Sequence, residues 1–262
     1  MGLFDKKYCD FCGNKIGLLG NKKLEDGNMC KDCASQLSPW FSERRHSTKE
    51  EISAQLAYRE ENKKLVAAFH TTRSIGKHTK LLLDEDQRRF AVTSASNLES
   101  ANPDILRYDQ VTGCDLDIDE SRHELKQTDK DGKQVSYNPP RYEYSYNFYV
   151  TIHVNHPYFD DIRYSLSNGY VKTGERAMGG APGGWRVNRP GALSGPGLSH
   201  YYEYLNTGNE IKDTVDRMRL AAREEAIAQS TPQAAVVCPF CGATTLPDAN
   251  GCCEYCGSAL RN

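Results

Sequence analysis

The chain has 262 residues, of which 38% are hydrophobic, and its formal net charge is −2 with neutral histidines. Its apolar runs, such as Leu81 to Leu83, are far shorter than the roughly 18 residues that a membrane-spanning helix needs. The negative charge disfavours sequence-independent nucleic-acid binding, because that affinity comes mainly from the neutralisation of phosphates. The length allows one ordinary domain and two small ones.

The first segment, residues 1–41, contains two Cys-x-x-Cys pairs. Cys9 and Cys12 form the first pair, and Cys30 and Cys33 follow after seventeen residues. This spacing lies within the range of four-cysteine metal sites. We therefore expect a small N-terminal metal module.

A helical connector is expected over residues 48–69, a stretch that contains neither Gly nor Pro. Thr48 and Glu51 have the spacing of a capping box, which is typical of a helix start. Ile52, Leu56, Val66 and Phe69 form only a broken apolar stripe. The pattern predicts a helix, but not a tightly packed one.

From residue 71 the period of the apolar residues changes to two. Alternation from Tyr142 to Val154 predicts one long strand that is buried on one face. Further strand-like runs are Leu106 to Ile118, Lys80 to Leu83, Arg88 to Thr93 and Ile162 to Leu166. The segment predicts an antiparallel sheet that forms a small barrel or sandwich within a domain of residues 71–229.

The end of that domain has two further features. Residues 174–199 are rich in Gly and Pro and predict a flexible insertion loop. Residues 209–229 return to helical spacing and predict a closing helix. Residues 230–235 are expected to be a linker into a C-terminal module, residues 236–262. The predicted fold class is therefore an α+β multidomain protein with a small metal module on each side of the β-domain.

The C-terminal module contains the strongest motif in the chain. Cys238 and Cys241, and then Cys253 and Cys256, form two knuckles that each end in Gly and are separated by eleven residues. Glycine after the second Cys permits the positive φ of such a turn. Cys252 is a less favoured alternative to Cys253, and a disulfide or redox dithiol is the alternative to metal. The eight predicted ligands of two structural Zn²⁺ ions are Cys9, Cys12, Cys30, Cys33, Cys238, Cys241, Cys253 and Cys256.

Other chemistry-bearing residues have simpler explanations. His153, His156 and Asp160 are the best candidate for a catalytic or metal site, but they also fit a loop between two strands. Cys114 shares its parity with apolar residues and is expected in the core. The aromatic residues from Tyr142 to Phe148 favour core packing over base stacking. Trp185 and Arg186, in the Gly-rich segment, could touch a partner, but the segment favours an unstructured insertion.

Three resemblances follow from these residues. Cys9-Asp-Phe-Cys12-Gly13, Ile16-Gly-Leu-Leu-Gly20 and Cys30-Lys-Asp-Cys33 resemble a bacterial family of unknown function that carries an N-terminal four-cysteine domain. Residues 238–260 resemble the double-knuckle zinc ribbon of many bacterial proteins. The order of strands and closing helix resembles a bacterial pleckstrin-homology-like domain. These resemblances imply binding modules without known catalytic residues.

The sequence thus predicts a cytoplasmic zinc-binding adaptor or scaffold rather than an enzyme. A filled four-cysteine site has no open position for a substrate, and two such sites would lower the net charge to about −6. A protein partner is expected, peripheral association with a membrane component stays open, and nucleic acid is the less favoured partner. The alternatives are a nucleic-acid-binding regulator and a redox- or zinc-responsive switch.

Overall fold

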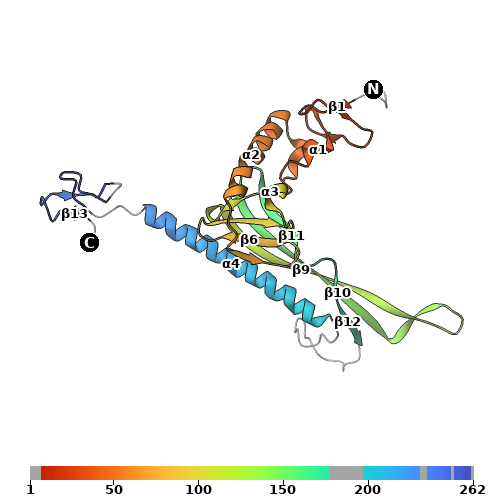
Figure 1. Ribbon diagram of the computed structural model, residues 1–262. Helices are drawn as coiled ribbons and strands as arrows, with labels where there is room; N and C mark the ends of the chain where they lie inside the picture. The colour runs from red at the N-terminus through yellow and green to blue at the C-terminus, as the bar shows by residue number, and fades with distance from the viewer. Residues whose placement is uncertain (1–6, 178–196, 231–234, 249–250, 261–262) are drawn as a thin grey trace. The chain divides into compact units, whose positions relative to one another are not determined.

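The computed structural model describes residues 7–177, 197–230, 235–248 and 251–260 (Figure 1). The chain separates into two compact units, residues 1–219 and 220–262. Both combine short antiparallel strands with a four-cysteine cluster, and the first also holds two larger antiparallel sheets and most of the helices.

The N-terminal module consists of two tiny hairpins and a short helix. Its elements are β1 (Lys7–Tyr8), β2 (Lys15–Ile16), β3 (Lys22–Lys23), β4 (Asn28–Met29), α1 (Lys31–Ala34) and the 3-10 helix η1 (Glu43–His46). Leu24 and Met29 are fully buried in a core that also contains three of the cysteines. That core includes Ile52 of the next helix, and Leu56 packs against it, so the packing of this module reaches beyond the expected residues 1–41.

Helix α2 (Lys49–Ala68) joins this module to the β-structure. The predicted capping box is present, since Thr48 accepts the Glu51 N–H and Glu51 accepts the Thr48 N–H. The buried stripe of the helix is regular but polar in its middle, and it contains Ile52, Gln55, Arg59, Asn62 and Val66. This explains why the apolar pattern of the sequence looks broken.

The first larger sheet has the order β5-β6-β7-β8, and every pair is antiparallel. Its strands are β5 (Arg73–Ile75), β6 (Lys80–Asp84), β7 (Arg89–Thr93) and β8 (Leu106–Arg107), with helix α3 (Leu98–Ala101) before β8. Val66 and Phe69 at the end of α2 pack against Leu82, Ala91 and Ile105. One helix therefore has its first turns in the metal module and its last turn on this sheet.

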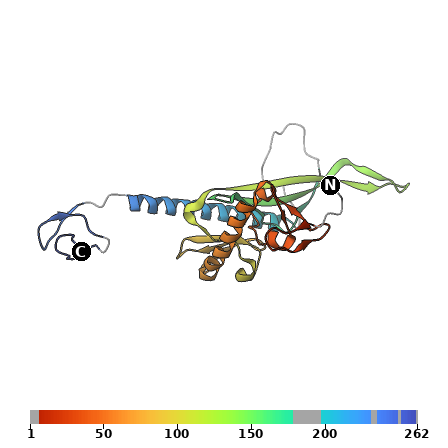
Figure 2. The same cartoon turned by 90° about the horizontal axis from the view of Figure 1, so that it is seen from above.

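The second larger sheet is built around one long strand. Strand β10 (Gln134–His156) pairs with β9 (Val111–Thr128), β11 (Phe159–Ser165) and β12 (Val171–Ala177), and the 3-10 helix η2 (Tyr108–Gln110) precedes β9. The predicted alternation is confirmed, because Phe148, Val150 and Ile152 are fully buried. The β9–β10 hairpin continues beyond the other strands as a two-stranded arm (Figures 1 and 2).

Helix α4 (Leu198–Ser230) covers the buried face of this sheet over its first part (Figure 2). Ile211 and Val215 are fully buried, and the Tyr201 ring lies edge-on to Phe148 at 5.2 Å between centroids. A Cβ on Gly208 would lie 2.5 Å from a methyl of Leu116, so a larger residue here would require the Leu116 side chain to shift.

Three sequence expectations differ from the structure. Neither larger sheet closes into a barrel within the described residues, because the two sheets share no paired strand. The Gly-rich insertion expected at residues 174–199 begins as strand β12, and residues 178–196, including Trp185 and Arg186, lie outside the described residues. The closing helix begins at Leu198 rather than residue 209, because aromatic contacts with the sheet stabilise its first turns.

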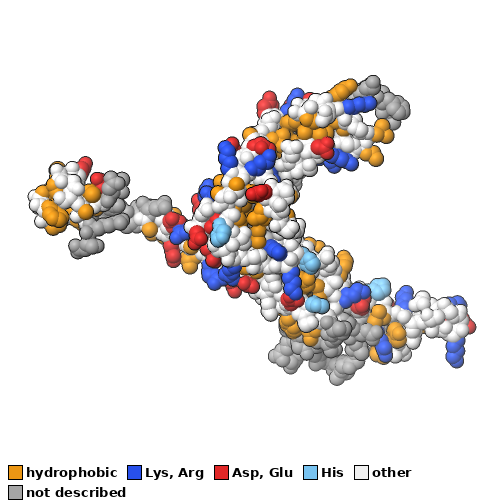
Figure 3. All heavy atoms as spheres, viewed as in Figure 1, with side chains coloured by type: hydrophobic (Ala, Val, Ile, Leu, Met, Phe, Trp, Pro, Cys, Tyr) orange, Lys and Arg blue, Asp and Glu red, His pale blue; other side chains and the backbone are white. Residues whose placement is uncertain are grey.

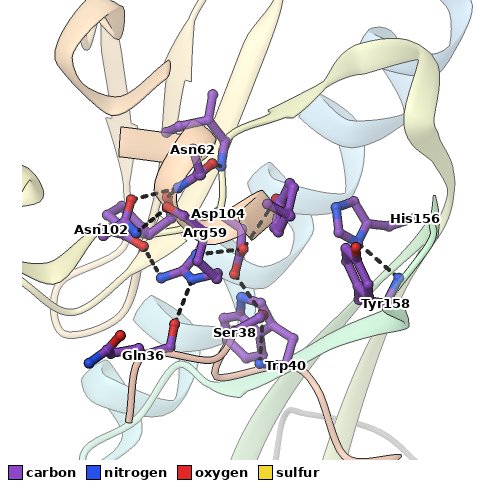
Figure 4. A network of polar contacts seen from close by, with 12 residues as sticks. Gln36, Ser38, Trp40, Arg59, Asn62, Asn102, Asp104, His156 and Tyr158 are labelled. Atoms are coloured by element: carbon purple, nitrogen blue, oxygen red, sulfur yellow. Dashed lines mark hydrogen bonds and ion pairs between the residues drawn. The ribbon is translucent and has the colours of Figure 1, made fainter. Parts of the chain in front are cut away.

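A buried ion pair fixes the N-terminal module against α2 and the segment before β8 (Figure 4). The Arg59 Nη1 atom lies 2.7 Å from Asp104 Oδ1, and the side chains are 6% and 0% exposed. Ser38 of the metal module donates to Asp104 Oδ2 at 2.7 Å, and Tyr58 donates to Oδ1 at 3.2 Å. The carboxylate therefore has partners from two segments besides its own.

The same network satisfies the surrounding backbone. Arg59 donates to the carbonyl oxygens of Gln36 and Asn102, while Asn62 donates to that of Pro103 and accepts the Ile105 N–H at 3.0 Å. Because the polar groups of Asp104, Arg59 and Asn62 all have partners, the network stabilises one relative placement of module, helix and sheet.

Replacing Asp104 with Ala would leave the Arg59 guanidinium buried without its counter-charge. We expect the free energy of unfolding to fall by about 3–5 kcal/mol, measured by urea denaturation. Glu60→Ala is the matched control, since it removes only an exposed partner of Lys63, and such pairs contribute little. Equal losses in the two variants would contradict a structural role for the buried pair.

Candidate metal centres

The N-terminal cluster brings together the four cysteines that the sequence singled out. Cys9 and Cys12 lie in the knuckle between β1 and β2, where the Gly13 N–H donates to the Cys9 carbonyl oxygen at 2.9 Å. Cys30 caps α1, and its sulfur accepts the Cys33 N–H at 3.4 Å. The helix start thus places the second pair opposite the first.

The C-terminal cluster uses two knuckles of the same kind. Strands β13 (Val236–Val237) and β14 (Thr244–Thr245) flank the first knuckle, and the second follows in a segment with isolated bridges. The glycines after the second cysteines, Gly13, Gly242 and Gly257, have φ values of 71°, 73° and 70°. The predicted positive φ is therefore confirmed in all three knuckles.

The sulfur spacing distinguishes a metal site from a disulfide. The distance between Sγ atoms is 3.7 Å for Cys12 and Cys30, and 3.6 Å for Cys238 and Cys256. A regular tetrahedron with metal–sulfur bonds of about 2.3 Å has edges of about 3.8 Å. A disulfide needs about 2.05 Å, and every described cysteine is free. Both clusters could therefore hold a metal ion.

The N-terminal thiols differ in acidity. Burial raises the pKa of Cys9, but backbone N–H groups, first that of Cys30, outweigh it and lower the pKa to about 6. Burial and the neighbouring sulfurs raise the pKa of Cys33 well above its usual value. All four sulfurs ionise together only when a cation compensates their charge.

The C-terminal cluster behaves in the same way. The hydroxyl and then the backbone N–H of Ser258 lower the pKa of Cys256 to about 6. The Ala243 N–H lowers the pKa of Cys241, but loss of hydration and the adjacent sulfurs together outweigh this effect and raise the pKa to about 12. Ser258 was not predicted from the sequence, because nothing in the cysteine spacing distinguishes it.

The structure selects Cys253 over Cys252. Cys253 is buried within the cluster, whereas Cys252 lies outside it, pairs with Ala259 across an isolated bridge, and donates its N–H to Asp248 at 2.8 Å. The register taken from the first knuckle therefore selects the same four cysteines that form the cluster.

These two clusters predict a metal content of two ions per chain in the purified protein. Cys253→Ser should reduce it to one, because a sulfur of the tetrahedron is lost. Cys252→Ser is the matched control and should retain both ions. Elemental mass spectrometry measures the ratio, and loss of an ion from the Cys252 variant would show that the register slips.

The histidine candidate site is not assembled. His153 lies on the exposed face of β10, with Nε2 3.0 Å from Asp115 and Nδ1 2.5 Å from Asp161. His156 is buried and stacks on Phe159 at 4.1 Å between centroids. The two imidazoles therefore lie in different environments and do not face a common site. This agrees with the explanation that the motif belongs to the strand ends and their loop rather than to a catalytic or metal site.

These environments shift the two pKa values in opposite directions. Hydrogen bonds to Asp115 and Asp161 raise the pKa of His153, whereas burial lowers that of His156. Protonated His153 stabilises the fold below the ordinary pKa of about 6.5, and this contribution is lost as the pH rises through its raised value. Neutral His156 stabilises the fold above about 6.5, and this contribution is lost as the pH falls towards its lowered value.

We expect NMR titration of the imidazole C–H signals to show His153 titrating above about 6.5 and His156 below it. Asp161→Asn should move the His153 midpoint down and leave that of His156 unchanged. Coincident midpoints for the two rings in the native protein would contradict the assigned contacts.

Two further sequence candidates lie in the core. Cys114 is buried, and loss of hydration raises its pKa to about 12, so the thiol stays protonated at neutral pH. Tyr144, Tyr146 and Phe148 are buried, and Tyr146 and Phe148 contact Tyr201 of α4. These three aromatic side chains are therefore core residues, as expected, whereas Tyr142 at the start of the stripe is half-buried, with the Arg122 guanidinium 5.2 Å from its ring centroid.

Comparison with known proteins bears on one part of the chain. Residues 7–55 match DUF4428, a domain of unknown function. The match includes the N-terminal cluster and reaches Ile52, which belongs to the same core. It confirms the N-terminal resemblance over this range, while the ribbon and pleckstrin-homology-like resemblances stay predictions. Neither the curated proteins nor the solved structures gave a match.

None of the described helices is both long enough and apolar enough to cross a membrane.

Proposed function

We propose that this protein is a cytoplasmic zinc-binding adaptor in which two structural Zn²⁺ ions shape small docking modules. The observation that carries the proposal is the pair of four-sulfur clusters, in which the Cys12–Cys30, Cys238–Cys256 and Cys241–Cys253 sulfurs lie 3.6–3.7 Å apart and all sulfurs of a cluster lie within 4.8 Å of one another. Thiolate sulfur in tetrahedral geometry is the donor set that structural zinc prefers.

Four cysteines around one Zn²⁺ leave no coordination position for water or substrate, so we assign neither site a catalytic role. The metal instead supplies folding free energy to modules whose strands are only two residues long. A role in docking follows naturally, since zinc fixes the conformation of the loops around it.

The C-terminal module offers apolar surface at its knuckles. In the N-terminal module, Phe11 stands between the paired cysteines and packs against the core of that module. The corresponding C-terminal residues, Phe240 and Tyr255, are each 71% exposed. Figure 3 shows hydrophobic side chains on the visible face of this module. Aromatic side chains are the usual anchors of protein interfaces, which favours a protein partner.

The β-structure supports a binding role. Four strands of one antiparallel sheet are followed by strands of a second sheet and by a covering helix, in the order expected of a pleckstrin-homology-like domain. Such a domain would serve as a further docking module, and we propose no catalytic centre in it.

The adaptor proposal is tested by affinity purification from native cells with the variant Phe240→Ala/Tyr255→Ala. We expect a protein partner to be enriched by the native chain and lost by the variant, because its interface anchors are gone. The variant should still contain two metal ions, since no ligand is changed. Leu220→Ala, at a position 56% exposed in the same unit, is the control and should retain the partner.

Two results would contradict the proposal. Equal recovery of partners by all three chains would remove the knuckle aromatics as the docking surface. Recovery of nucleic acid in place of protein, with binding that weakens as salt rises, would favour the nucleic-acid-binding alternative.

A further inference from the structure

The turn between β2 and β3 presents two leucines at its tip. Gly20 donates its N–H to the Gly17 carbonyl oxygen at 3.0 Å, which closes a four-residue turn with Leu18 and Leu19 at the central positions. These side chains are 89% and 86% exposed. They therefore contribute almost nothing to the core, at positions where turns usually carry polar residues or Gly.

The turn is held by a rigid base. Ile16 before it and Leu24 after it are buried in the core of the metal module. The Asn21 amide donates to the side-chain oxygen of Asn28 on β4 at 2.8 Å. The two leucines are thus presented by a fixed scaffold and need no folding step in order to bind.

Positive charge surrounds the leucines. Residues 15–23 contain Lys15, Lys22 and Lys23 and no acidic residue, in a chain whose net charge is −2. Tyr8, which is 54% exposed, pairs with Lys15 on the adjacent strand. Figure 3 shows hydrophobic and basic side chains beside one another on this module.

Two carboxylates near the turn, Asp10 and Asp26, are engaged elsewhere, whereas Glu25 of the β3–β4 hairpin is exposed. Asp10 accepts the Asn28 N–H at 2.6 Å, and Asp26 accepts the Lys49 N–H at the start of α2 at 2.9 Å. Within the described residues, Lys15, Lys22 and Lys23 form no ion pair, so their charges remain available to a partner.

We propose that the Leu18–Leu19 turn inserts into the interface of an anionic lipid bilayer while Lys15, Lys22 and Lys23 contact the headgroups. The inference rests on the proposed adaptor function and names what the N-terminal module docks to. Two leucines on a tight turn offer far less than the roughly 800 Å² per partner of a standard protein interface. A bilayer needs no complementary groove, and it accepts apolar side chains with basic residues above them.

Vesicle co-sedimentation of the full, metal-loaded chain tests this inference. We expect binding to phosphatidylcholine vesicles that contain phosphatidylglycerol, weaker binding to pure phosphatidylcholine vesicles, and a decline as salt rises. Leu18→Asp/Leu19→Asp should weaken binding at least about a hundredfold, because both inserted side chains are lost. Each single Lys→Ala change at position 15, 22 or 23 should weaken it about fivefold.

Two control variants match these changes. Leu220→Asp/Leu246→Asp alters two leucines that are 56% and 54% exposed in the other unit, and Lys63→Ala/Lys64→Ala alters exposed lysines of α2. Both should bind vesicles like the native chain. Metal content measured on the same samples shows that the N-terminal module of each variant stays folded.

Equal binding by the Leu18→Asp/Leu19→Asp variant and the native chain would overturn the inference, as would no vesicle binding by a native chain that holds both metals. Self-association of the native chain that is lost in the Leu18→Asp/Leu19→Asp variant, with no binding to vesicles, would also overturn the inference. It would show that the turn binds a second copy of this chain. In each case capture of a protein partner through Phe240 and Tyr255 would leave the adaptor proposal intact. If no protein is captured but vesicle binding is retained, the proposed protein partner is rejected and the membrane inference stands.

Discussion

The first unit depends on the neutralisation of one buried carboxylate. Asp104 is fully enclosed, and an ionised carboxylate in that position is tolerated only with a cation and full hydrogen bonding. Arg59 provides the charge, and Ser38 and Tyr58 complete the shell. Because Ser38 belongs to the metal module, the hydrogen bond with which it stabilises the Asp104 carboxylate also attaches that module to the sheet.

The network also reaches the second sheet through Tyr58. Its ring lies edge-on to His156 at 5.1 Å and beside Tyr158 at 5.3 Å, both at the β10–β11 turn. Burial, helped by Asp104, raises the pKa of the Tyr58 hydroxyl further above neutral pH, so the group donates its hydrogen bond over the whole physiological range. Metal module, helix and both sheets thus meet around one polar cluster.

The two metal modules differ in their surroundings although their knuckles are alike. The N-terminal knuckle packs its aromatic residue, Phe11, half-buried against its own core, and α2 adds Ile52 to that core. The C-terminal knuckles leave Phe240 and Tyr255 in solvent within a separate unit. The shared motif therefore presents its aromatic residue to solvent much more in the C-terminal module than in the N-terminal one.

The cysteine sites were predictable because a knuckle is local: both sulfurs and the glycine that turns the chain lie within five residues. The strands with alternating apolar and polar residues and the capping box of α2 could be predicted for the same reason. The expectation of a barrel was wrong, because closure depends on which distant strands pair, and the two larger sheets share no paired strand among the described residues. The polar stripe of α2 was also missed, since Arg59 and Asn62 look like surface residues until their partners are known.

The sequence alone therefore determined the two groups of four cysteines, the main helices and strands, and the buried face of β10. Only the tertiary structure decided that Asp104 meets Arg59, that Cys252 stands outside its cluster, and that no described part of the chain covers Leu18 and Leu19. The physical reason is the range of the interactions. Backbone periodicity and ligand spacing are set within a few residues, whereas burial and charge compensation depend on segments that folding brings together from far apart.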